Sequence, residues 1–159
     1  MEQWPEPVER VAAVLRERAV NARVEEFPQG TPTAGAAARA VGCDRSQIVK
    51  SLVLVCDGLP VLALVPGDRR ADAAKVAAAV GAGYARIARP EEVTAATGFE
   101  AGAVAPFPVP NVTRILLERD LLRHDTVWIG AGSPRHMAAL SPVDLGRIAG
   151  AAVAEIAEG

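Results

Sequence analysis

The chain of 159 residues predicts an α+β fold: a mixed, mostly antiparallel β-sheet or barrel flanked by helices. Two observations lead to this class. Stretches with helical periodicity are interspersed with short apolar stretches typical of strands, and the hairpin signal Asp57-Gly58 joins two of those strands. The order of elements does not follow the regular β-α-β alternation of a parallel sheet. The length suits one hydrophobic core, so we expect residues 1–159 to form a single domain.

The first half of the chain is expected to contain two helices and three strands. They are, in order, a helix at 6–20, a strand at 23–27, a helix from Thr33 to Val41, and strands at 47–56 and 60–66. The first helix rests on Val8, Val11 and Leu15, which recur at helical spacing. The second has a capping threonine, Thr33, and ends at Gly42, which suits a left-handed residue.

The second half is expected to alternate helices with further strands. They are a helix from Asp68 or Arg70 to Val80, a helix from Glu91 to Thr97, strands at 113–118, 126–131 and 135–140, and a final helix after Ser141-Pro142. Pro90 suits the start of the second of these helices and Gly98 its end. The loop that follows, residues 98–110, is punctuated by glycine and proline, and Gly130 to Pro134 is a predicted turn.

Composition excludes several classes of protein. No apolar run approaches the roughly 20 residues that span a bilayer, so we expect no membrane association. The N-terminus is acidic and lacks an apolar signal core, which favours the cytoplasm. Cys43 and Cys56 share no CxxC spacing and no histidine cluster accompanies them, so neither a disulfide nor a zinc site is expected. Cys56 is expected to be a core residue; a nucleophilic Cys43 remains an alternative.

The formal net charge of −2 gives no overall signature of nucleic-acid binding. It leaves room for local basic patches. The candidates are Arg69-Arg70, the pair Arg86 and Arg89, and Arg135, although such residues are most often solvated surface.

Lys50 is the most informative residue. It interrupts an apolar strand in a chain that has only one other lysine, Lys75. A buried ammonium costs several kcal/mol unless it is paired or faces a wet cavity, so Lys50 is expected to serve chemistry. The alternative is a strand-edge lysine whose head reaches solvent.

Three features are expected to meet in one pocket: Lys50, the loop 98–106 and the turn from Gly130 to His136. Each is weak alone. Gly130-x-Gly132 lacks the third glycine of a dinucleotide fingerprint. His136 by itself is more often structural than catalytic.

Taken together, four segments in this order resemble the YbaK/ProX family of aminoacyl-tRNA editing proteins, which includes the editing insertion of bacterial prolyl-tRNA synthetases. The resemblance covers residues 24 to 148. Its segments are the alanine-rich helix Thr33 to Gly42, the lysine strand Gln47-Ile48-Val49-Lys50-Ser51-Leu52, the loop Gly98-x-x-x-Gly102-x-Val104-x-Pro106-Phe107, and the turn Gly130-x-Gly132-x-x-x-His136.

The resemblance implies a hydrolase of mischarged tRNA that needs no protein nucleophile, no metal and no cofactor. A water molecule would attack the ester with help from the terminal ribose of the tRNA. Lys50 would hold a phosphate or the ester, and His136 would shape the amino-acid end of the pocket rather than act as a general base. The residues expected to bind substrate are Thr33, Gly98, Gly102, Pro106, Gly130, Gly132 and Ser133. No serine, histidine and acid arrangement is evident in the sequence.

The implied substrate is Ala- or Cys-tRNA(Pro), attacked in trans. The implied partners are the tRNA acceptor end and prolyl-tRNA synthetase. A pocket built for proline excludes alanine or cysteine weakly, because one methylene is worth only about 1–3 kcal/mol, so a second sieve is needed. Two alternatives remain: an inactive tRNA- or nucleotide-binding accessory module, and a thiol-dependent enzyme that uses Cys43 or Cys56.

Overall fold

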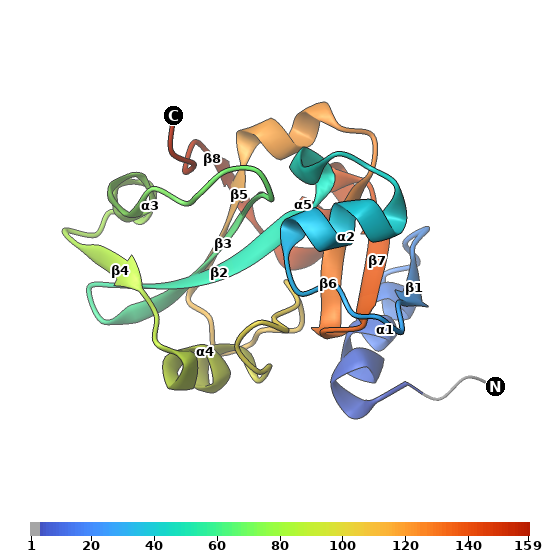
Figure 1. The fold of residues 1–159 in the computed structure, drawn as a ribbon. Helices are drawn as coiled ribbons and strands as arrows, with labels where there is room; N and C mark the ends of the chain where they lie inside the picture. The colour runs from blue at the N-terminus through green and yellow to red at the C-terminus, as the bar shows by residue number, and fades with distance from the viewer. Residues whose placement is uncertain (1–3) are drawn as a thin grey trace.

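Two β-sheets form the centre of the structure, a computed structural model that describes residues 4–159 (Figure 1). The strands are β1 (Arg23–Glu26), β2 (Val49–Cys56), β3 (Leu59–Pro66), β4 (Ala85–Ile87), β5 (Arg114–Glu118), β6 (Val127–Ser133), β7 (His136–Leu140) and β8 (Ala152–Ala154). The larger sheet has the order β4-β2-β3-β5-β8 and the smaller one β1-β7-β6. The two sheets meet where Ile48, just before β2, forms a parallel bridge with Trp128 of β6.

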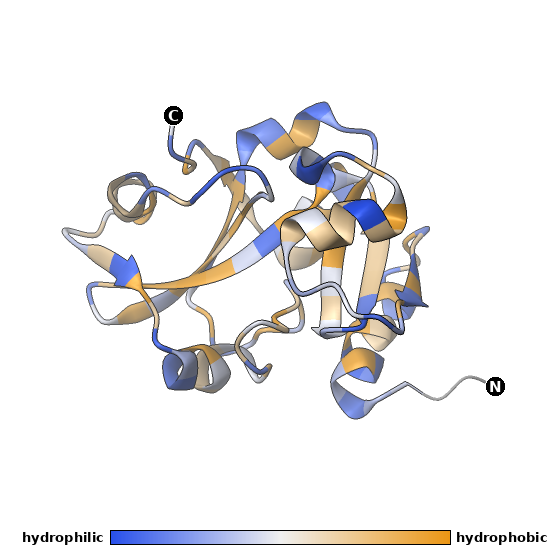
Figure 2. Ribbon diagram, in the orientation of Figure 1, coloured by the Kyte–Doolittle hydropathy of each residue, from blue (hydrophilic) through white to orange (hydrophobic). Residues whose placement is uncertain are grey.

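Helices surround these sheets. They are α1 (Glu6–Glu17), α2 (Ala34–Val41), α3 (Ala73–Val80), α4 (Pro90–Thr97) and α5 (Pro142–Ala149), with 3-10 turns η1 (Arg45–Gln47) and η2 (Arg119–Arg123). The main core joins α1 to both sheets through residues such as Val11, Leu62 and Ile129. Figure 2 shows hydrophobic residues along β3, β6 and β7, whereas the loop between β3 and α3 is hydrophilic.

The predicted α+β class with a mixed, mostly antiparallel sheet is confirmed. The pairs β3–β5 and β5–β8 are parallel, and the other strand pairs are antiparallel. The alternative of a barrel is wrong, because the larger sheet ends at two different edge strands, β4 and β8. Figure 1 shows these two strands at separate places on the sheet.

Several predicted boundaries are wrong. The helix expected from Asp68 or Arg70 begins at Ala73, because the carboxylate of Asp72 accepts the N–H of Lys75 and caps it there. The first helix ends at Glu17 rather than at residue 20. The turn predicted from Gly130 to Pro134 is shorter, because β6 continues through Ser133 with a bulge. The sequence analysis also missed the strands β4 and β8 and the 3-10 turns η1 and η2.

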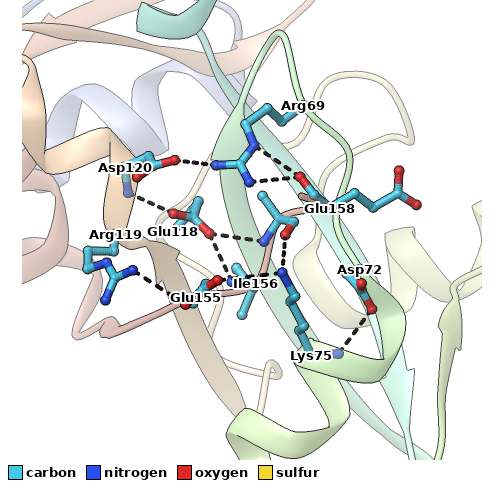
Figure 3. A network of polar contacts seen from close by, with 10 residues as sticks. Arg69, Asp72, Lys75, Glu118, Arg119, Asp120, Glu155, Ile156 and Glu158 are labelled. Atoms are coloured by element: carbon cyan, nitrogen blue, oxygen red, sulfur yellow. Dashed lines mark hydrogen bonds and ion pairs between the residues drawn. The ribbon is translucent and has the colours of Figure 1, made fainter.

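A buried carboxylate anchors the C-terminal segment to the larger sheet (Figure 3). Glu118, at the end of β5, is 1% exposed. Its two oxygens accept the N–H groups of Asp120 at 2.7 Å, Ile156 at 2.9 Å and Ala157 at 3.0 Å. Burial by itself would raise the pKa of Glu118, but these N–H donors and the nearby charge of Arg69 outweigh it, so the pKa lies below its ordinary value.

Exposed ion pairs and hydrogen bonds around this carboxylate join the same parts of the fold, the C-terminal segment and the larger sheet. We call this region the C-terminal junction. Arg69 pairs with Asp120 and donates two hydrogen bonds to the carbonyl oxygen of Glu158. Lys75 donates to the carbonyl oxygen of Ala157 at 3.0 Å. Strand β8 has only three residues, so its own backbone hydrogen bonds hold it weakly. These side-chain contacts therefore help to fix the C-terminal segment to the larger sheet.

We expect Glu118→Gln to lower the free energy of unfolding by about 2–3 kcal/mol, since hydrogen bonds to a charged group are worth roughly 1.5–3 kcal/mol. The amide nitrogen of glutamine would replace one accepting oxygen, so at least one backbone N–H would lose its acceptor. A folded-state pKa below the unfolded value of about 4.3 stabilises the fold above that pH. This stability is lost as pH falls through the folded pKa, so the difference between wild type and variant should shrink in acid. Urea unfolding at pH 7 and below pH 4 measures both effects.

The matched control is Glu155→Gln. Glu155 contacts Lys75 and Arg119 at the surface of the same junction, and an exposed pair is worth only about 0–1 kcal/mol. Equal losses in the two variants would contradict the anchoring role of Glu118.

Candidate functional site

A cavity of about 330 Å³ lies where the two sheets meet. Residues from four segments line it: Thr31 to Ala34 and Ala37 at the start of α2, Ile48 to Leu52 at the start of β2, Gly102 to Val104, and Gly130, Ser133, Pro134, His136 and Met137 of the β6–β7 hairpin. The lysine strand, the glycine loop and the histidine hairpin, which sequence analysis expected to share a pocket, all line it. Of the expected site residues, the lining includes Thr33, Lys50, Gly102, Gly130, Ser133 and His136.

The wall formed by α2 is tied to the hairpin. The carbonyl oxygen of Pro134 accepts the N–H of Thr31 at 2.9 Å, and that of Arg135 accepts the N–H of Phe27 at 2.6 Å. The hydroxyl of Thr33 accepts the N–H of Ala36 at 3.0 Å, so its oxygen serves as the helix cap. Thr33 therefore shapes the wall mainly through the position of α2.

Lys50 carries a charge without a protein counterion. It is partly buried on β2 opposite Val65. In residues 4–159 no carboxylate pairs with its ammonium. Burial lowers the pKa of Lys50, the positive charges of Arg45 and Arg70 lower it further, and Asp68 opposes them. The ammonium is thus available to an anion in the cavity.

The loop at residues 102–104 presents backbone donors. Gly102 has φ +87°, and a Cβ there would meet open space. The N–H of Ala103 is used in a turn, where it donates to Glu100 at 2.9 Å. Within residues 4–159, the N–H groups of Gly102 and Val104 donate to no protein acceptor. Two unpaired amides beside a cationic side chain can bind a developing negative charge.

His136 is buried, with Nδ1 in a hydrogen bond and Nε2 facing a carboxylate. It is 4% exposed, and its Nδ1 lies 2.5 Å from the hydroxyl oxygen of Ser133, which also accepts the N–H of Arg135 at 3.0 Å. Nε2 lies 3.9 Å from a carboxylate oxygen of Glu26, and Trp4 packs edge-on against the ring. Burial lowers the pKa of His136, Glu26 opposes this, and Arg135 lowers it further.

The surroundings of the ring favour one tautomer. The carboxylate oxygens of Glu26 can only accept, so the proton of the neutral ring is favoured on Nε2, which faces them, and the Ser133 hydroxyl then donates to Nδ1. Nδ1 is then an acceptor, and Nε2 carries the proton toward Glu26. A ring in this state has no free lone pair with which to take a proton from water.

The sequence shows no serine, histidine and acid arrangement, but the fold brings Ser133, His136 and Glu26 near one another. Glu26 was missed because its closeness to His136 depends on the register between β1 and β7, where these two residues are paired. No local pattern in the sequence reports that register.

Three expected substrate-binding residues lie outside the cavity lining. Gly98 ends α4, and its carbonyl oxygen accepts a hydrogen bond from Arg10 at 2.9 Å. Pro106 is buried beside Phe107 in a separate hollow. Gly132 has φ +97°, and a Cβ there would lie 2.7 Å from the carbonyl oxygen of Pro7, so this glycine lets β6 pack against α1. In these positions the three residues support the fold and do not line the cavity.

Ser51 was missed as a candidate. It lines the cavity, and its buried hydroxyl oxygen has no hydrogen-bond partner within residues 4–159. Its place next to Lys50 in the sequence was a signal, but the alternation of a strand predicts opposite faces for neighbours.

Residues 4–159 contain no group of three or more histidine, cysteine, aspartate or glutamate side chains placed to hold a metal ion. No helix in this part of the chain is both long and apolar enough to cross a membrane.

The sequence of this chain matches a known protein family. The profile of the aminoacyl-tRNA editing domain matches residues 28–148. A proline–tRNA ligase of Nitratidesulfovibrio vulgaris (strain Hildenborough) is 34% identical over 113 residues, which cover 70% of this chain and 20% of the ligase. The chain therefore spans about a fifth of the length of this relative.

Two further relatives match over most of their length. The uncharacterized protein YwhH of Bacillus subtilis (strain 168) is 34% identical over 123 residues, covering 77% of this chain and 78% of YwhH. A crystal structure of a protein proposed to be a trans-editing enzyme for prolyl-tRNA synthetase superposes with a TM-score of 0.91 at 39% identity. It covers 99% of this chain and 100% of that chain.

We expect Ser133→Ala to raise the pKa of His136 toward its ordinary value. Without the hydroxyl, the neutral ring is less stable, and a hydrogen bond worth about 0.5–1.5 kcal/mol corresponds to a shift of at most roughly one unit. In the wild type, ¹⁵N NMR should find the proton on Nε2, and in the variant both tautomers should be populated.

The control for this experiment is Ser141→Ala. The hydroxyl of Ser141 caps α5 by accepting the N–H of Asp144 at 3.0 Å, and it makes no contact with His136. This variant should lose stability yet leave the titration of His136 unchanged. A wild-type ring protonated on Nδ1, or an unaltered titration in Ser133→Ala, would refute the assigned tautomer.

Proposed function

The chain belongs to the aminoacyl-tRNA editing domain family, and we propose that it hydrolyses the ester bond between a small amino acid and the 3′ end of a mischarged tRNA. One observation carries the proposal. The uncompensated ammonium of Lys50 and the unpaired N–H groups of Gly102 and Val104 line the same cavity.

In the proposed reaction a water molecule attacks the ester carbonyl carbon. The carbonyl oxygen becomes negative, and the N–H groups of Gly102 and Val104 stabilise that charge. The carbon–oxygen bond to the ribose then breaks, the ribose oxygen takes a proton, and free amino acid and tRNA leave. A hydroxyl group of the terminal ribose positions the water, so no protein nucleophile is required.

Lys50 would bind the phosphate preceding the terminal adenosine or the ester itself. Its pKa is lowered by burial and by neighbouring arginines, so an anion that neutralises them is favoured at this point. Removal of an amino group that has no protein partner should not disturb the fold.

His136 would set the size of the amino-acid end. It is neutral and buried, and the nearby lining residues Ala34, Ala37, Ala103 and Met137 are apolar. Such walls suit a small side chain, such as that of alanine or cysteine, better than a charged one. Because the lone pair of Nδ1 is used by Ser133 and the protonated Nε2 faces Glu26, we assign His136 to pocket shape rather than to general base catalysis.

The thiol-dependent alternative has little support. Neither Cys43 nor Cys56 lines the cavity. Burial raises the pKa of each thiol, and a neighbouring carboxylate raises it further, so both remain protonated thiols rather than nucleophilic thiolates.

The substrates and partners of the proposal follow from the family. The acceptor end of tRNA(Pro) carrying alanine or cysteine is the proposed substrate, attacked in trans. Prolyl-tRNA synthetase is the proposed partner, and the cytoplasm the proposed location.

The test is ester loss from Ala-, Cys-, Ser- and Pro-charged tRNA(Pro), with Lys50→Ala beside the wild type. We expect the wild type to hydrolyse Ala- or Cys-tRNA and to spare Pro-tRNA. Lys50→Ala should lower kcat/KM by roughly 10- to 100-fold, because a charged hydrogen bond is worth about 1.5–3 kcal/mol. Its melting temperature should change little.

Lys75→Ala is the matched control, since Lys75 is the chain's other lysine and contacts the C-terminal segment instead. It should keep wild-type turnover. A wild type that hydrolyses none of the four esters yet binds tRNA would support the inactive accessory module. Full activity in Lys50→Ala would make Lys50 a solvated strand residue.

His136→Ala should lower activity on the preferred small amino acid and change the ratio between substrates, because a 1 Å misplacement of the ester can cost about 10²-fold. Larger aminoacyl groups should lose less. Rates on two charged tRNAs across pH, with a melting curve and His124→Ala as control, test this.

The other roles for His136 give different patterns. A general base would lower all substrates uniformly by about 10²–10⁴ and abolish a titration near neutral pH. A purely structural histidine would lower thermal stability and leave substrate ratios unchanged. Either result would overturn the pocket-shaping role.

A further inference from the structure

The structure divides the arginines of this chain into paired and unpaired groups. Arg69 pairs with Asp120, and Arg86 and Arg89 pair with Glu92. By contrast, within residues 4–159 no carboxylate pairs with Arg39, Arg45 or Arg70. We refer to these three residues as the arginine tract.

Two members of the arginine tract line a groove beside the cavity. The groove is formed by Arg39, Arg45 and Asp68 together with the adjoining parts of α2 and η1. Helix α2 separates the two hollows: Ala34 and Ala37 face the cavity, whereas Ala38 and Arg39 face the groove. An elongated ligand that leaves the cavity past α2 therefore meets these arginines.

A close backbone contact holds the loop that carries the third member, Arg70, next to the other two. The N–H of Gly67 donates to the carbonyl oxygen of Ile48 at 2.7 Å, and a Cβ on Gly67 would lie 2.6 Å from the carbonyl oxygen of Arg45. The hydrophilic loop that follows β3 is thus held against η1 and the start of β2 (Figure 2). Arg70 lies in this loop.

The charges in this region oppose one another. Arg45 and Arg70 both lower the pKa of Lys50, and Asp68 only partly offsets them. Lys50, Arg45 and Arg70 repel one another because one carboxylate offsets them only in part, and a polyanion that lies along them relieves this repulsion. The whole chain, with the arginine tract included, has a net charge of −2, so a local group of arginines orients an approaching polyanion.

We infer that the arginine tract binds the phosphodiester backbone of RNA next to the nucleotide whose ester lies in the cavity. This inference rests on the proposed function and extends it. In this arrangement Lys50 contacts the 3′ end that carries the ester, and the arginine tract binds the RNA strand that leads to that end. Phosphate contacts supply affinity without reading sequence, and they make it depend on salt.

The test compares three alanyl substrates that differ in backbone: 3′-alanyl-adenosine, an alanyl-CCA trinucleotide and an alanyl minihelix. The variants are Arg45→Gln/Arg70→Gln and Arg39→Gln. The matched control is Arg18→Gln/Arg114→Gln, which removes the same charge. Arg18 caps α1. Arg114 pairs with Val61 near the start of β3, whereas Lys50 pairs with Val65 near its end.

We expect the double variant to hydrolyse alanyl-adenosine at the wild-type rate and to lose roughly tenfold or more in kcat/KM on the minihelix. The slope of log(kcat/KM) against log[salt] should become shallower by about 0.7 for each single-strand phosphate that the variant no longer neutralises. A loss shared by the trinucleotide assigns the phosphates to the single-stranded end; a loss confined to the minihelix assigns them to the duplex. Arg39→Gln should show a smaller loss of the same kind.

Three outcomes would overturn the inference. The first is an equal loss on alanyl-adenosine, which means that the arginines act on the cavity itself. The second is a loss on the minihelix no greater than in the control. The third is an effect seen only when prolyl-tRNA synthetase is added, which would make the tract a docking site for an acidic protein surface.

Failure of the proposed function can be told apart from failure of this inference. Binding of an uncharged minihelix, followed by fluorescence anisotropy at several salt concentrations, needs no hydrolysis. A wild type without esterase activity that still loses RNA affinity in the double variant would refute only the proposed reaction.

Discussion

The site depends on the contact between the two sheets at the start of β2. There Ile48 bridges to Trp128, and Gly67 allows the end of β3 to approach Ile48 and Arg45 at backbone distance. Next to this contact, residues of α2 and of the loop at 102–104 line the cavity together with the start of β2 and the β6–β7 hairpin. Lys50 lies two residues after the bridge and lines that cavity.

Charged side chains are paired differently at the C-terminal junction and at the cavity. At the C-terminal junction, charges are matched: Glu118 is saturated by N–H donors, and Arg69 and Lys75 have carboxylate partners. At the cavity, Lys50 and its neighbouring arginines lack them. Unmatched charge costs stability, and proteins accept such costs mainly where function needs them.

The serine and histidine of the hairpin show why proximity alone does not define a catalytic group. Ser133 and His136 are within hydrogen-bond distance, with Glu26 nearby, as in a nucleophilic triad. In the favoured tautomer, the serine donates to the ring and the remaining ring proton faces the acid. This arrangement keeps a neutral ring in the wall of the cavity and does not present the serine as a nucleophile with the histidine as its base.

The sequence by itself determined the features that short-range chemistry controls. The cap at Thr33, the left-handed residue at Gly42, the Asp57-Gly58 hairpin and the family segments around Lys50 all depend on neighbours in the chain. Tertiary structure decided the rest. The three-residue strands β4 and β8 exist only because a partner strand is present, and Glu26 meets His136 only through strand register. Gly102 and Gly132 look alike in sequence, yet one borders the cavity and the other packs against Pro7, because burial is a property of the assembled fold.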